Sequence, residues 1–227
     1  MRSNLMPKML NCNGRLLSLA QPQVMGILNA TPDSFFSGSR VETERDIVLR
    51  AQQILDEGGS IIDIGAYSTR PFAEDVSEAE ELRRMGNALR VVRREFPDAI
   101  VSVDTFRAGV ARMSVEEFGA DIVNDISAGT FDPEMLDTVA QLRVPYIAMH
   151  TQGKPESMQA APTYNNVAAD VIAHLSERIQ ALRRLGIADI VIDPGFGFGK
   201  SITHNFELLR HLDAFDIFGL PILVGIS

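Results

Sequence analysis

Short runs rich in Val and Ile alternate along this chain with longer stretches whose apolar residues recur at helical spacing. This alternation is typical of βαβ units around a parallel sheet. The short runs are almost continuously apolar, which indicates that both faces of the sheet are buried. Seven strands are expected, at residues 24–29, 60–65, 100–104, 122–126, 145–150, 190–193 and 222–225. Helices are expected at residues 44–57, 77–96, 108–118, 133–142, 167–185 and 204–215.

The spacing of these units predicts an α/β fold of the (β/α)8 TIM barrel type. A closed barrel has eight strands and about 250 residues, so seven strands are visible here and strand 8 and the last helices are missing. An open doubly wound sheet could also use seven strands, but its first turn is usually rich in glycine, and here that turn reads Asn29-Ala30-Thr31-Pro32-Asp33. We expect a single domain over residues 1–227, with residues 1–21 as an N-terminal leader.

Composition limits the partners and the cellular location. The 227 residues include 21 basic and 30 acidic side chains, a net charge of −9, which argues against nucleic acid as a partner. No apolar run reaches the roughly 20 residues that span a bilayer, and residues 1–20 lack the apolar core of a secretory signal. A cytoplasmic location is therefore expected. The single cysteine, Cys12, cannot form an intramolecular disulfide and lies outside every motif.

Polar residues stand at or just after the carboxyl ends of six of the seven strands, where barrel enzymes place their chemistry. A single buried polar group is most often paired with a neighbouring loop, but six strand ends at one rim indicate a binding site. The residues are Asn29, Asp33, Ser68, Thr69, Arg70, Asp104, Asn124, Asp125, His150, Gln152, Asp193 and Lys200.

These residue types divide the rim into two halves. Carboxylates and amides suit a flat heterocycle that carries amino and amide N–H donors, because one carboxylate can accept two such bonds side by side. Arg70 and Lys200, together with loop amides at helix N-termini, suit a phosphate or pyrophosphate. The combination describes a pterin-like or purine-like ring with a phosphorylated arm.

Five segments of the chain carry distinctive motifs, from about Val24 to the last residue. They are Met25-Gly26-Ile27-Leu28-Asn29-Ala30-Thr31-Pro32-Asp33-Ser34-Phe35, Ser68-Thr69-Arg70-Pro71, Ser102-Val103-Asp104-Thr105, the stretch from Met149 to Gln159, and Asp193-Pro194-Gly195-Phe196-Gly197-Phe198-Gly199-Lys200. In sequence, order and spacing, these segments closely resemble the signatures of the dihydropteroate synthase family, a pterin-binding branch of the barrel enzymes.

The resemblance implies a folate-pathway transferase that joins a pterin pyrophosphate to 4-aminobenzoate, with pyrophosphate as leaving group. It implies that Asp104, Asn124 and Asp193 hold the pterin ring, and that Asn29 meets the pyrophosphate through a bound Mg2+. Asp33, Thr69 and Arg70 would act with Asn29 in the loops, and Lys200 would also contact substrate. The 4-aminobenzoate would lie against Pro71 and Phe198. A homodimer and sensitivity to sulfonamides are typical of the family.

Some positions depart from the family pattern. Gly65-Ala66-Tyr67 stands where Gly-Gly-Glu is usual, and Phe72 replaces a glycine, which makes a stiffer turn after Pro71. Phe36 and Ser39 also replace smaller residues in the first loop. The family's Ser-Arg-Lys after strand 7 would begin at Ser227, and its Arg-x-His on strand 8 lies beyond the chain. A chain without them is expected to be inactive or very weakly active and, as a monomer with unpaired strand edges, poorly stable.

Two other functions stay open at the level of sequence. A folate-dependent methyltransferase of the same barrel class would read the ring with similar carboxylates, but it would not need the Thr-Pro-Asp-Ser-Phe loop or Arg70. A non-enzymatic pterin-binding remnant is the other alternative. Pyrophosphate binding that depends on Mg2+ separates the synthase from the methyltransferase, and turnover by the full-length protein excludes the remnant.

The missing barrel elements predict that the natural protein is longer by about 50 residues, which is the length of two elements at barrel spacing. Intact-mass measurement of the natural protein tests this prediction. A mass clearly above 24.9 kDa is expected, and a mass near 24.9 kDa would contradict it.

Overall fold

A six-stranded parallel sheet forms the centre of the computed structural model, which describes residues 8–30, 44–67, 76–153 and 162–225. Its strands pair in chain order, so each strand lies beside the one that precedes it in the sequence. The predicted barrel architecture and its first six strands are confirmed. The strands are β3 (Met25–Asn29), β4 (Ile61–Gly65), β5 (Ile100–Asp104), β6 (Ile122–Asp125), β7 (Tyr146–Met149) and β8 (Ile190–Asp193).

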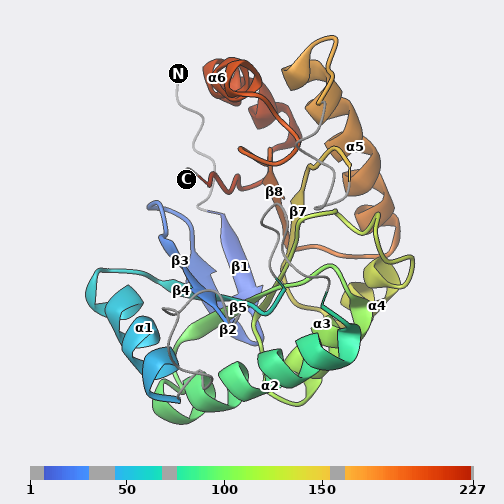
Figure 1. The fold of residues 1–227 in the computed structure, drawn as a ribbon. Coiled ribbons are helices and arrows are strands. Elements are labelled where there is room, and N and C mark those ends of the chain that lie inside the picture. The colour runs from blue at the N-terminus through green and yellow to red at the C-terminus, as the bar shows by residue number, and fades with distance from the viewer. Residues whose placement is uncertain (1–7, 31–43, 68–75, 154–161, 226–227) are drawn as a thin grey trace.

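Helices follow the strands and lie around the outside of the curved sheet (Figure 1). Side-chain caps begin several of them, as when Ser77 accepts from the backbone N–H of Glu80 and Asn166 accepts from that of Ala169. The helices are α1 (Glu44–Asp56), α2 (Glu78–Glu95), α3 (Ala108–Glu116), α4 (Met135–Leu142), α5 (Val167–Arg184) and α6 (Ile202–Arg210), with a 3-10 helix η2 (Leu212–Phe218) after α6. The predicted helices are present, with ends that differ by a few residues.

Successive residues of each strand face opposite sides, and this alternation separates the helical core from the barrel interior. On β4, Ile62 and Ile64 are fully buried in the cluster that packs against the helices. Ile61 belongs instead to a second cluster inside the barrel. Asp63 and Gly65 share the inner face with Ile61, so polar groups on this face project into the barrel.

A β-hairpin closes the amino-terminal end of the barrel. Its strands β1 (Met9–Cys12) and β2 (Arg15–Ser18) pair antiparallel and cross the centre of the helical ring (Figure 1). Leu10, Cys12 and Leu17 pack on the first inward residues of the barrel strands, among them Ile61, Ile122, Ile147 and Val191. Residues within the expected leader therefore form part of the core.

Cys12 is fully buried in this hairpin. Burial, helped by the negative charge of Asp121, raises the pKa of its thiol to about 12. Cys12 is consequently a small packed core residue in the protonated form at physiological pH.

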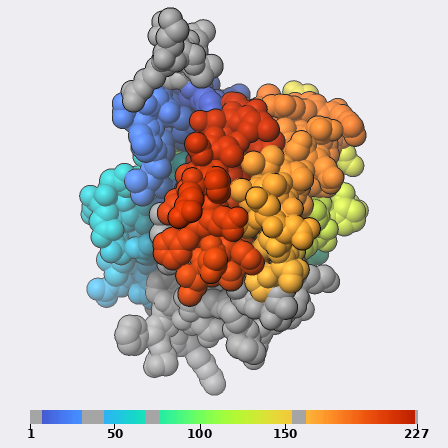
Figure 2. All heavy atoms as spheres, turned by 90° about the horizontal axis from the view of Figure 1, so that it is seen from above, coloured from blue at the N-terminus to red at the C-terminus, as the bar shows by residue number. Residues whose placement is uncertain are grey.

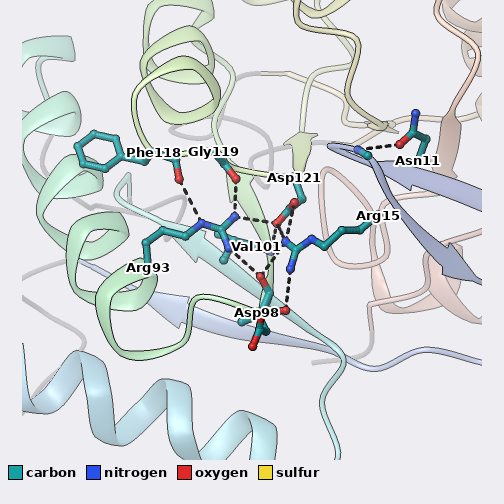
Figure 3. Close-up of polar contacts among 10 residues, drawn as sticks. Asn11, Arg15, Arg93, Asp98, Val101, Phe118, Gly119 and Asp121 are labelled. Carbon is teal, nitrogen blue, oxygen red and sulfur yellow. Dashed lines mark hydrogen bonds and ion pairs between the residues drawn. The ribbon is translucent and has the colours of Figure 1, made fainter.

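Asp121 joins the hairpin to the barrel through a partly buried ionic network (Figure 3). Its carboxylate is 1% exposed and accepts from Arg15 of the hairpin at 2.8 Å and from Arg93 of α2 at 2.7 Å. The backbone N–H of Val101 donates a further bond of 2.8 Å. Both carboxylate oxygens are thus paired, as a buried charge requires.

The expected seventh strand is reduced to one parallel bridge, between Ile192 of β8 and Ile222. The backbone N–H of Ile192 donates to Pro221 and that of Leu223 donates to Ile192. The segment around these residues lies beside the N-terminal part of the chain (Figure 2), where Lys8 Nζ donates to the carbonyl of Leu220 at 2.7 Å. With a partner on one side only among the described residues, this segment forms no regular ladder.

A cavity of about 600 Å³ lies between the hairpin, the first barrel strand and the C-terminal segment. Its lining is largely apolar and includes Leu10, Met25, Val191 and Leu223.

Among the described residues, no helix is both long enough and apolar enough to cross a membrane.

Replacing Asp121 with Ala is expected to lower the free energy of unfolding by about 3 kcal/mol, because two arginines and a buried N–H would lose their shared acceptor. Urea unfolding followed by circular dichroism measures this change. Asp98→Ala is the matched control, since exposed Asp98 contributes only its backbone carbonyl to Arg15. A loss below 1 kcal/mol for Asp121→Ala would contradict the assigned role.

Candidate functional site

Three predicted site residues meet at the carboxyl ends of β3, β5 and β6. The strand register sets Asn29 opposite Gly65, Gly65 opposite Asp104, and Asp104 opposite Asn124. These four residues therefore lie side by side at one level of the inner face. Asp193 ends β8, two strands further along the same rim.

Gly65 lies between Asn29 and Asp104 in the strand register. A Cβ at this position would lie 3.5 Å from Oδ1 of Asn29 and 3.5 Å from Oδ2 of Asp104. The two oxygens thus flank a gap that any larger side chain would narrow. A small ligand or a cation could contact both oxygens from this gap.

The acidic side chains of the rim hold protons more tightly than usual. Burial raises the pKa of Asp104 well above its ordinary value, and the charges of Asp63, Glu81 and Asp125 raise it further. Burial raises the pKa of Asp193 to about 6, although the backbone N–H of Gly195 and the charge of Lys200 act in the opposite direction. Such groups suit a ligand that brings its own N–H donors or positive charge.

Lys200 and His150 support the loop that follows β8. Lys200 Nζ lies 3.0 Å from Nδ1 of His150 and donates to the carbonyls of Gly195 at 2.8 Å and Phe198 at 3.0 Å. Burial lowers the pKa of Lys200 to about 7, and burial together with the lysine charge lowers that of His150 to about 3. The lysine that the sequence assigns to substrate binding is 3% exposed and is surrounded by protein acceptors, so its contact with substrate stays a prediction.

Gly195 brings this loop against the strand before it. Its φ is +72°, and a Cβ here would collide with the carbonyl oxygen of His150. The backbone N–H of Gly195 donates to Asp193 Oδ1 at 2.7 Å, which fixes the Asp193 carboxylate. The N–H of Phe198 donates to Gly195, and the Phe198 ring is partly exposed at the loop tip.

Comparison with known proteins gives a consistent result. The family described as "Pterin binding enzyme" matches residues 25–227. The dihydropteroate synthase of Haemophilus influenzae is 43% identical over 220 residues, which cover 96% of this chain and 79% of that protein. The chain belongs to the dihydropteroate synthase family.

Solved structures of this family share the fold. The dihydropteroate synthase of Xanthomonas albilineans with 4-aminobenzoic acid superimposes with a TM-score of 0.89 at 42% identity, covering 98% of this chain and 79% of that one. A structure of the same enzyme in complex with 7,8-dihydropteroate gives a TM-score of 0.85 at 40% identity, covering 97% and 78%. A Yersinia pestis dihydropteroate synthase with a sulfonamide drug gives 0.89 at 41% identity, covering 97% and 80%.

Four residues that the family resemblance assigns to the site lie outside the described residues. They are Asp33 of the first loop and Thr69, Arg70 and Pro71 of the second. Their roles stay predictions.

Asp125 is a strand-end residue whose contacts are structural. It follows Asn124 and therefore points to the opposite face of β6. There its Oδ2 accepts from the hydroxyl of Tyr146 at 2.6 Å, and its Oδ1 accepts from the backbone and the side chain of Ser127. Asp125 thus holds the loop after β6, away from the barrel interior.

The departure at Tyr67 is accommodated by Arg107. The Arg107 guanidinium lies over the Tyr67 ring at 5.3 Å and over the Phe106 ring at 5.2 Å. The same guanidinium pairs with the buried carboxylate of Glu81, which also accepts from the Thr105 hydroxyl at 2.7 Å. Arg107 thus links Tyr67, just after β4, to the buried Glu81 of α2.

Asp63 is the inward carboxylate that sequence reasoning missed. It lies on β4 below Gly65, is 5% exposed, and has a pKa raised by burial to about 6. The signal was present in the sequence, since Asp63 interrupts the apolar run Ile61-Ile62-Asp63-Ile64. The sequence prediction took only residues at the ends of strands as site residues and therefore omitted Asp63.

The raised pKa of Asp193 predicts a pH-dependent effect on stability. The folded chain holds this proton up to about pH 6, whereas the ordinary value is 3.8, so the ionised carboxylate costs stability at neutral pH. Asp193→Asn should therefore raise the free energy of unfolding by about 2 kcal/mol at pH 7.5, and the gain should vanish as the pH falls through 6 towards 4.

Urea unfolding across this pH range measures the effect. Asp137→Asn, a change at an exposed position on α4, is the control and should alter stability little at any pH. An Asp193→Asn variant that is less stable than the parent by more than about 1 kcal/mol at pH 7.5 would contradict the assignment.

Proposed function

We propose that this chain catalyses the dihydropteroate synthase reaction. In this reaction the amino nitrogen of 4-aminobenzoate displaces pyrophosphate from the methylene carbon of 6-hydroxymethyl-7,8-dihydropterin pyrophosphate. The observation that carries the proposal is the convergence of Asn29, Asp104 and Asn124 around Gly65. The family relationship supports the same reaction.

The rim is suited to bind the pterin ring through its N–H edge. Asp104 and Asp193 supply carboxylate oxygens, and Asn124 supplies an amide. A carboxylate can accept two parallel N–H bonds from an amino group and the adjacent ring nitrogen. Because burial disfavours the ionised carboxylates, a ring that donates to them regains part of that free energy.

The residues of this chain act by orientation and charge. The nitrogen of 4-aminobenzoate is neutral at pH 7 and attacks the methylene carbon with its lone pair. A C–N bond forms as the C–O bond to pyrophosphate breaks, and the nitrogen then loses a proton to water. Positive character that develops on the pterin methylene would be stabilised by the charge of the ring-binding carboxylates.

A magnesium ion at Asn29 is part of the proposal. The Oδ1 atom of Asn29 and the carboxylate of Asp104 flank the open space at Gly65, and Mg2+ prefers oxygen ligands of this kind. When bound, Mg2+ supplies positive charge for the leaving pyrophosphate. We propose that Asn29 holds the ion and that Thr69 and Arg70 of the second loop act beside it.

The remaining expectations for the family are also proposals for this chain. Contact of 4-aminobenzoate with Pro71 and Phe198 is supported by the partly exposed Phe198 ring at the tip of the loop that follows Asp193. A homodimer is supported by exposed apolar side chains on α6, where Ile202 and Phe206 are 77% and 70% exposed. A cytoplasmic location is supported by the unpaired, buried Cys12.

The purified full-length protein should form dihydropteroate and pyrophosphate in equal amounts from the two substrates, and removal of Mg2+ with EDTA should abolish turnover. Asp104→Asn should lower kcat/KM about 100-fold, because an amide cannot accept two parallel N–H bonds. Asp137→Asn is the matched control and should retain full activity. The proposal would be contradicted if turnover were unchanged both after EDTA treatment and in the Asp104→Asn variant. Methyl transfer from a methylfolate without pyrophosphate release would favour a methyltransferase.

A further inference from the structure

Asp63 carries a buried carboxylate inside the barrel, one layer below the residues of the mouth. It precedes Gly65 by two positions on β4 and therefore shares its inward face. Its register partner on β5 is Ser102, which is fully buried. The reaction proposed above assigns Asp63 no contact with either substrate.

Asp63 makes one side-chain hydrogen bond among the described residues. Its Oδ2 accepts from Nδ2 of Asn124 at 3.2 Å, across the intervening strand β5. Its Oδ1 is buried without a hydrogen-bond partner among these residues, as is the hydroxyl oxygen of Ser102. The Ser102 hydroxyl and the Asn124 amide both lower the pKa of Asp63, against the larger effect of burial, which raises it.

An ionised carboxylate only accepts hydrogen bonds, so it determines which end of the Asn124 amide faces it. The NH2 group must point to Asp63, and the amide oxygen must then point to the other side. Without such a partner, the two ends of an asparagine amide can exchange by a half-turn about its last torsion. The chain therefore contains a group that fixes Asn124 as an acceptor toward the mouth.

We infer that Asp63 is a positioning residue for ring recognition, which holds the Asn124 amide so that its oxygen accepts an N–H of the bound heterocycle. The inference rests on the proposed function, because it concerns the ring that Asn124 would contact. It deepens that function because Asp63, which does not touch the ring, would make the site select rings that present an N–H donor to Asn124.

A purely structural role accounts poorly for this carboxylate. Among the described residues, one oxygen accepts no hydrogen bond and the side chains that act on the carboxylate, Asn124 and Ser102, are neutral, whereas Asp121 at the other end of the barrel is paired with two arginines. Burial of a charge in this way costs stability. Its charge also raises the pKa of Asp104, which adds to the cost. An apolar side chain at position 63 should therefore stabilise the fold and impair ring binding.

The test measures stability and ring binding together. Calorimetry with 6-hydroxymethylpterin as the probe gives the dissociation constant for the parent, Asp63→Leu, Asp63→Asn and the matched control Ser102→Ala, and thermal unfolding gives their stabilities. Asp63→Leu should bind the probe about tenfold more weakly without a lower unfolding temperature. Asp63→Asn keeps an acceptor oxygen and should bind within about threefold of the parent, and Ser102→Ala within about twofold.

A double-mutant cycle shows whether Asp63 acts through Asn124. In an Asn124→Leu background, Asp63→Leu should change binding less than about twofold. An undiminished tenfold effect in that background, or parent-like binding by Asp63→Leu alone, would overturn the inference while leaving ring binding by the parent intact. Loss of folding in Asp63→Leu would overturn it as well, because the account requires an unchanged or higher unfolding temperature. If the parent chain binds no pterin ring, the proposed function itself fails.

Discussion

The parallel register of four neighbouring strands is the constraint on which the candidate site depends. It sets Asn29, Gly65, Asp104 and Asn124 side by side on the inner face of the barrel, although almost a hundred positions of sequence separate the first from the last. Gly65 completes the arrangement because it leaves open the space that its neighbours flank. A slip of one residue in any of these strands would turn its polar group towards the helices.

The buried carboxylates at the two ends of the barrel differ in whether they are paired with arginine. At the amino-terminal end, Asp121 is enclosed by Arg15, Arg93 and a backbone N–H, and this pairing attaches the hairpin to the sheet. At the mouth and one layer below it, Asp104, Asp193 and Asp63 lack an arginine partner among the described residues, and burial raises the pKa of each. Unpaired carboxylates reduce stability, so their concentration at the mouth indicates selection for ligand binding.

Much of this arrangement can be predicted from the sequence, because apolar runs bounded by helical segments locate the strands and their polar ends locate the rim. The face of the sheet to which a given strand residue points is harder to predict. Asn124 and Asp125 look equivalent in sequence, yet Asn124 faces the barrel interior and Asp125 anchors a loop through Tyr146.

The hairpin at residues 9–18 was missed because strands of four residues carry too short a pattern, and their burial depends on contacts with distant strands. The seventh strand was expected from an apolar run at residues 222–225, but strand formation also requires neighbours with which to pair, and the structure shows one bridge.

The central claim is that side chains from separate strands form one mouth for a fused heterocycle. A crystal structure of the protein with bound 6-hydroxymethylpterin tests it most directly. The account predicts a ring whose N–H edge lies within hydrogen-bonding distance of Asp104, Asn124 and Asp193, with the amide oxygen of Asn124 facing the ring. A ring bound elsewhere, or one that contacts none of these three side chains, would contradict it.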